Sequence, residues 1–124
     1  MQLKPKPLGG DQIVSHDFPE SDWKIFRELR ELALERFCKR VLDQIEPLRL
    51  NASRSHHERY LDVSRFLQER DEELGRAFND PRRSQMIFQL GAMYADGLLE
   101  PNELARFSER TRATVALLAK ELAR

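Results

Sequence analysis

The feature that most constrains this chain is the apolar run from Met86 to Leu99, because no other segment is as hydrophobic over the same length. At the 100° turn per residue of an α-helix, its apolar side chains spread almost all the way round. It is shorter than the roughly 20 apolar residues that cross a bilayer, and Gly97 and Pro101 follow closely. We therefore expect a central helix over residues 82–96 that the rest of the chain covers on nearly every side.

Two long segments before this run have the periodicity of amphipathic helices. The first begins at residues 17–20 and runs to about Glu46, where Pro47 limits it. Its apolar side chains cover a face that is wider than one neighbouring helix can bury, so it packs against two neighbours or against another subunit. The second is predicted over residues 56–78, because Ser55 and Glu58 have the spacing of a capping box.

Two shorter helices are expected after the central one. Pro101 has the character of a first helical residue, and Ser108 is a cap for a last helix over about 109–123. No alternating β pattern competes with these assignments. The sequence thus predicts an all-α fold, a compact bundle of about five helices, three long and two short, around the central helix.

The ends of the central helix have their own signals. Asp80 is expected to cap it, with Pro81 in its first position. Gly97 predicts a left-handed stop, over which Leu98 folds back. Gly91 costs a helix about 1 kcal/mol relative to Ala, so we expect another helix to cross close to it.

Length and composition indicate one domain in a reducing compartment. Residues 1–16 contain two prolines and a Gly-Gly pair without periodicity, so we expect a flexible N-terminal tail before a single helical domain over 17–124. The formal net charge of 0 argues against a nucleic-acid or anionic-membrane partner. A single cysteine, Cys38, lies within an apolar run and predicts a buried thiol in a cytoplasmic protein.

The polar residues at the start of the second helix are candidates for a binding pocket. His56 and His57 are adjacent, so they point about 100° apart and do not chelate one metal ion by themselves. Tyr60 lies one turn further, and Arg70 falls on the apolar side, where it needs a carboxylate or a route to solvent. The alternative is that these are ordinary helix-start residues, and no metal site or cofactor is predicted.

Arg82 and Arg83 stand where the positive end of the central helix dipole attracts anions. They are candidates for holding a phosphate or an acidic partner. The alternative is that the expected cap, Asp80, already occupies this helix end.

Part of the wide apolar face of the first helix is a candidate subunit interface. Its residues are Trp23, Ile25, Leu29 and Leu32. Trp23 is either an exposed anchor for a partner or a residue that pins the start of the helix to the core.

Two segments carry a resemblance. Residues 17–24 (Asp-Phe-Pro-Glu-Ser-Asp-Trp-Lys) and 55–60 (Ser-His-His-Glu-Arg-Tyr) resemble segments of small bacterial helical proteins that have no assigned function. The resemblance implies a bacterial cytosolic origin and no particular mechanism.

These observations favour a non-enzymatic helical protein that acts through protein–protein contacts, including self-association as a homodimer. One alternative is a ligand- or metal-binding protein or enzyme with a pocket near His56, His57, Tyr60 and Arg70. A second is a nucleic-acid-associated regulator, which the neutral net charge disfavours.

Overall fold

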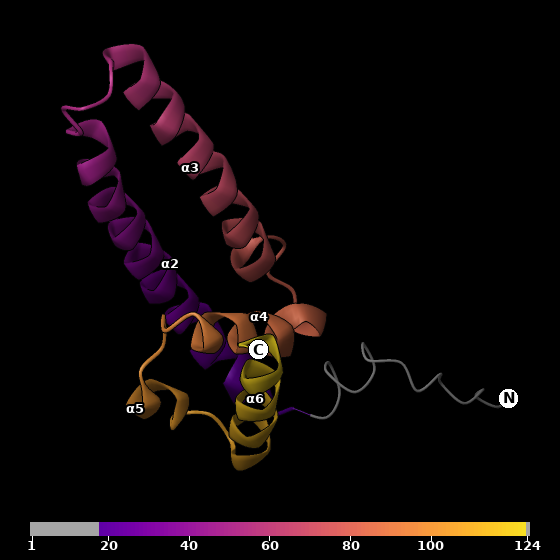
Figure 1. Ribbon diagram of the computed structural model, residues 1–124. Helices are drawn as coiled ribbons and strands as arrows, with labels where there is room; N and C mark the ends of the chain where they lie inside the picture. Colours follow the sequence, from indigo (N-terminus) through magenta and orange to yellow (C-terminus); the bar gives the residue numbers. More distant parts are fainter. Residues whose placement is uncertain (1–17, 124) are drawn as a thin grey trace, which may run out of the picture.

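The computed structural model describes residues 18–123, and every regular element within them is helical. The predicted flexible tail over 1–16 lies outside the described residues. The all-α prediction is confirmed. The elements, labelled as in Figure 1, are α2 (Glu20–Arg49), α3 (His56–Phe78), a 3₁₀ turn (Arg83–Gln85), α4 (Met86–Ala95), α5 (Pro101–Leu104) and α6 (Glu109–Leu122).

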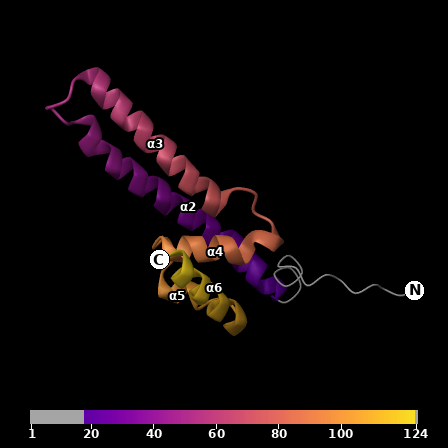
Figure 2. The same ribbon diagram turned by 45° about the vertical axis from the view of Figure 1, so that its right-hand side comes forward.

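The helices divide into a long hairpin and a smaller group at one end of it. In Figures 1 and 2, α2 and α3 run side by side in opposite directions, and α4, α5 and α6 gather near the start of α2 and the end of α3. We call α2, α3 and their connection the hairpin, and α4–α6 the head. The hairpin extends well beyond the head, so much of its length is only two helices thick.

The helix α4 is the buried centre that the sequence predicted. Its buried residues are Met86, Ile87, Gln89, Leu90, Gly91 and Met93. Phe88 is the exception, with 48% of its surface exposed. A side chain added at Gly91 would place its Cβ 3.1 Å from Cβ of Leu118 on α6. The close crossing predicted from that glycine is therefore confirmed.

The predicted stop of the central helix is confirmed in detail. Gly97 has φ +74°, a conformation that costs glycine little. The amide of Leu98 donates to the carbonyl of Met93 at 2.9 Å, and that of Gly97 to Tyr94 at 3.1 Å. This is the Schellman pairing, and Leu98 is buried against the core as the motif predicts.

The predicted caps at Ser55 and Ser108 are also confirmed. The Ser55 hydroxyl accepts from the Glu58 amide at 3.1 Å, and Glu58 accepts from the Ser55 amide at 2.9 Å. The Ser108 hydroxyl accepts from the amide of Thr111. Pro101 is the first residue of α5.

Two predicted boundaries are wrong. Pro47 does not limit α2, which continues to Arg49. The amide that a proline lacks would have bonded to the carbonyl of Asp43, an exposed residue whose carbonyl can turn to water. Asp80 does not cap α4, because it has φ +52° and its carboxylate binds the Arg82 guanidinium instead. Pro81 consequently lies outside any helix.

A buried carboxylate joins the start of α2 to the start of α6. Asp22 is 1% exposed and accepts from the Ser108 amide at 3.0 Å, from the Ser108 hydroxyl at 2.7 Å and from the Thr111 hydroxyl at 2.6 Å. The carboxylate also lies at the positive end of the α6 dipole, which favours a negative charge. Asp22 therefore holds α6 to the start of α2.

Two arginines of α2 hold the α4–α5 connection against the hairpin. The Arg36 guanidinium makes two hydrogen bonds of 2.7 Å to Glu103 and one of 2.9 Å to the Leu98 carbonyl. Arg40 donates to the carboxylate and the carbonyl of Asp96, each at 3.0 Å. The hydrogen bond from Arg36 lowers the pKa of Glu103 below its ordinary value, against a smaller opposing effect of burial.

The depressed pKa of Glu103 predicts a stability loss in acid. Because the folded-state pKa lies below the unfolded one, the ion pair stabilises the fold above the ordinary carboxylate pKa and stops doing so as the pH falls through the folded value. Glu103→Gln keeps a capping-box side chain but removes the charge. We expect it to lower the free energy of unfolding by about 1–2 kcal/mol at neutral pH, and the difference to shrink as the pH falls below the ordinary carboxylate pKa.

Urea unfolding of both proteins at several pH values measures this difference. Glu28→Gln is the matched control, because the pair of Glu28 with Arg106 at 2.7 Å is exposed on both sides and contributes little. A Glu103→Gln difference no larger than the Glu28→Gln difference at neutral pH would contradict the assignment.

Candidate interaction surface

The residues predicted to form a pocket at the start of α3 do not converge. His56, His57 and Tyr60 are exposed at the end of the hairpin that lies farthest from the head. Arg70 lies about 21 Å from His56 along the same helix, at 1.5 Å per residue. Among residues 18–123, no three His, Cys, Asp or Glu side chains are grouped as metal ligands would be.

The guanidinium of Arg70 finds both carboxylate and aromatic partners. It lies 3.1 Å from the carboxylate of Glu73 and 4.9 Å from the ring centroid of Phe66. The side chain keeps 27% of its surface exposed. Arg70 is therefore a half-buried charge that is paired within α3 itself.

Arg82 and Arg83 lie at the opposite end of the hairpin, and each is engaged within the chain. Arg82 binds Asp80. Arg83 binds Glu20 and lies 5.2 Å from the ring centroid of Trp23. Neither guanidinium joins the histidines in a common site.

The predicted interface on the first helix is only partly available to a partner. Leu29 is 2% exposed, so its assignment to an interface is wrong: it faces the core of its own chain. Trp23 is half-buried and stacks on Phe26 at 5.3 Å between ring centroids. Ile25 is half-buried too, whereas Leu32 is 41% exposed.

A cleft of about 300 Å³ lies between α3, α4 and the end of α6. Alanines 77, 92 and 95 and Leu122 supply its apolar lining. Both of its acidic residues already bind an arginine: Glu73 binds Arg70, and Asp96 binds Arg40. The cleft therefore offers a small apolar notch and no pair of free carboxylates for acid–base chemistry.

The long side of the hairpin that faces away from the head is the clearest candidate surface. Phe37 contacts Phe78 of α3, at 6.0 Å between ring centroids, and Val41 is buried one turn later. Arg36 and Arg40, one position before these residues, bind the head. Cys38 and Leu42 come one position after Phe37 and Val41, so they point about 100° away from the α3 contact, on the side opposite to the two arginines. Both are exposed.

The same relation holds on α3. In an antiparallel pair of right-handed helices, the positions that follow the contact residues lie on one common side. Phe66 is half-buried at the contact, and Leu67 after it is 37% exposed. We call this side the outer flank and define it by Glu35, Cys38, Leu42, Ile45 and Arg49 of α2 with Tyr60, Leu67 and Asp71 of α3.

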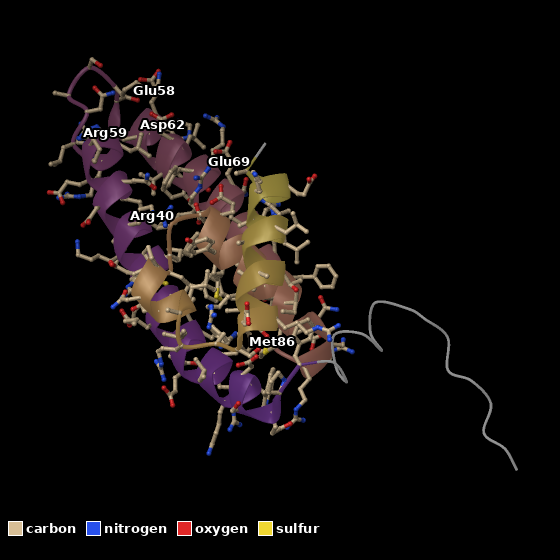
Figure 3. All side chains as sticks on the ribbon, turned by 90° about the horizontal axis from the view of Figure 1, so that it is seen from below. Arg40, Glu58, Arg59, Asp62, Glu69 and Met86 are labelled. Carbon is tan, nitrogen blue, oxygen red and sulfur yellow. The ribbon has the colours of Figure 1, made fainter. Side chains whose placement is uncertain are left out.

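The opposite side of the hairpin differs in character. Figure 3 labels Arg40, Asp62 and Glu69 there, among the charged side chains of the hairpin on the side where the head lies. Asp62 is held by two hydrogen bonds from Arg54, at 2.8 and 2.9 Å. One side of the hairpin thus carries charged side chains that pair with one another within the chain, whereas the outer flank carries exposed apolar side chains.

The exposed thiol corrects a prediction. Cys38 was expected to be buried, because apolar residues surround it in the sequence. It is exposed, because the helix turns Phe37 toward α3 and Cys38 toward solvent. The outer flank itself had a sequence signal: Cys38, Leu42, Ile45 and Arg49 are spaced by four, three and four residues, which places them on one helical stripe.

The apolar residues of α3 are buried near the head and include exposed ones farther along the helix, although Val63 is half-buried. The α3 stripe of alternating three- and four-residue spacing is typical of a coiled-coil seam. Ala77 is 7% exposed near the head, Leu67 is 37% exposed midway and Tyr60 is 67% exposed at the far end. Leu67 and Tyr60, which belong to the outer flank, are not covered by the head.

No protein-family model, curated protein or solved structure matches the chain. Between residues 18 and 123, no helix is both long enough and apolar enough to cross a membrane.

Proposed function

We propose that this is a non-enzymatic helical protein that associates with a second copy of itself through the outer flank of the hairpin. Two packed helices bury only the sides that face each other. Four helices enclose a shared core, and this is the usual way in which helical hairpins complete their burial. A second hairpin placed on the outer flank would produce such a four-helix arrangement.

The observation that carries the proposal is the distribution of exposed apolar side chains. Of the nine large hydrophobic residues that are exposed among residues 18–123, six belong to the hairpin, and three of these six, Leu42, Tyr60 and Leu67, lie on the outer flank. Single exposed apolar residues are ordinary, whereas a contiguous group indicates a contact surface. Leu42, at 66% exposed, is the centre of the outer flank on α2.

Leu42→Glu tests the proposal. We expect the unaltered full chain to show a rising average mass in sedimentation experiments between about 1 μM and 1 mM, the range of weak to moderate complexes. The variant should raise the dissociation constant at least tenfold, because a carboxylate is costly to desolvate in an apolar contact. Circular dichroism should be unchanged, since position 42 is solvent-exposed in the single chain.

Leu117→Glu is the matched control. Leu117 is 63% exposed, but it lies on α6 in the head. The same substitution there should leave association unchanged. A wild-type chain that stays monomeric over the whole range, or equal effects at positions 42 and 117, would overturn the proposal.

A further inference from the structure

We infer that the two hairpins pair antiparallel, about a two-fold axis that passes Leu42; this inference rests on the proposed function and adds the orientation of the partner. The outer flank has opposite charges at its two ends. Glu35 stands seven residues before Leu42 and Arg49 seven residues after it. Seven residues are nearly two helical turns, so all three lie on one stripe, about 10 Å apart.

Neither charge is satisfied within the described part of the chain. Glu35 and Arg49 are both exposed, and neither side chain makes an ion pair among residues 18–123. Asp71, on α3 near the head, adds an exposed carboxylate to the acidic end of the outer flank, and it also lacks an ion pair there. The acidic end of the outer flank is therefore nearest the head and the basic end is farthest from it.

This arrangement is self-complementary in one orientation only. A two-fold axis at Leu42 places Arg49 of each copy opposite Glu35 of the other, which gives two ion pairs. In a parallel pairing, Arg49 would face Arg49 and Glu35 would face Glu35. Like charges in direct opposition are a common device for excluding the wrong register in helical pairs.

The size of the outer flank predicts a weak dimer. Its length from Glu35 to Arg49 is about 21 Å at 1.5 Å per residue, and two packed helices are about 20 Å wide. Each copy would bury on the order of 500 Å², so the total only reaches the roughly 1,000 Å² that separates specific interfaces from adventitious ones. Charge matching then decides the orientation.

The position of Cys38 fits a non-covalent pair. Cys38 lies four residues from Leu42, so the axis would separate the two thiols by about 12 Å along the helices. A disulfide requires Cα atoms within about 7 Å. Association should therefore be the same with and without a reductant.

Charge reversal on the outer flank separates the orientations. Arg49→Glu and Glu35→Arg alone each create two like-charge contacts in the antiparallel pair, so each should raise the dissociation constant roughly tenfold at low salt. The double variant Glu35→Arg with Arg49→Glu restores both ion pairs and should return the dissociation constant to within about threefold of wild type. In a parallel pair, each position faces its own copy, so a reversal only replaces one like-charge contact with another. The wild type, the two single variants and the double variant would then associate alike.

Lys120→Glu is the control for the change in net charge, because Lys120 is exposed on α6 in the head. It should leave association unchanged. Dimers of equal affinity for all four flank proteins, or singles that the double variant does not rescue, would overturn the orientation while leaving the proposed function intact. A wild-type monomer at every concentration would overturn both the orientation and the proposed function.

Discussion

Asp22→Ala should lower the free energy of unfolding by about 3 kcal/mol, which corresponds to a fall of roughly 10 °C in the melting temperature of a domain of this size. The substitution removes the carboxylate that accepts three hydrogen bonds. One amide and two hydroxyl donors at the start of α6 then lose this acceptor. Two of these bonds come from Ser108, and the third comes from Thr111, which is fully buried. Buried donors that lose their acceptor carry the full cost of desolvation.

Two companion variants show where the loss arises. Asp22→Asn keeps one acceptor oxygen and a similar shape, so we expect a loss of about 1 kcal/mol. Glu109→Ala removes an exposed carboxylate from the same helix start and should also cost less than about 1 kcal/mol. Denaturant unfolding followed by circular dichroism measures all three. If Asp22→Ala were no worse than Glu109→Ala, Asp22 would not hold α6.

Gly91→Val should also destabilise the fold by about 3 kcal/mol, through overpacking between α4 and α6. The added Cβ would lie 3.1 Å from Cβ of Leu118, an atom that cannot rotate away, and 3.7 Å from the end of Leu122. Valine then adds two methyl groups to the same crowded space. The helices must separate, or the backbone of one must shift, and either change disturbs the most buried part of the head.

Gly75→Val is the matched control for helix propensity. A Cβ at Gly75 would approach only the amide end of Asn79, at 3.2 Å, and that side chain can move. Valine is a slightly better helix former than glycine, so we expect a change within about 0.5 kcal/mol at position 75. Thermal unfolding of both variants gives the comparison. Equal effects at the two positions would show that α4 and α6 are not in close contact.

The helices and most of their ends could be predicted because their signals are local. The capping box at Ser55 and the stop at Gly97 depend on residues within one turn of each other. The wrong boundaries also have local causes. Pro47 follows by four positions an exposed residue, Asp43, and Asp80 has an arginine two residues later that competes for its carboxylate. A pattern of residue types does not show which of two competing partners a side chain binds.

Which residues are exposed was harder to predict, because exposure depends on where the other helices pack and how far they extend. A helical wheel groups Leu29, Cys38 and Tyr60 with apolar neighbours, but it does not show which side of each helix the other helices cover or how far they extend. Leu29 lies beside the head and is buried, whereas Tyr60 lies beyond it and is exposed. The outer flank is exposed because the head packs on the opposite side of α2, where Arg36 and Arg40 bind it.

The link between Asp22 and Thr111 constrains the order in which the chain can fold during synthesis. The partners of this contact are separated by 89 positions, whereas α2 and α3 are neighbours joined by a short connection. Contacts between neighbouring segments form early, and distant ones wait until both partners exist. On the ribosome, the hairpin can assemble while the apolar face of α4 is still uncovered. That face stays open to chaperones until α6 has emerged.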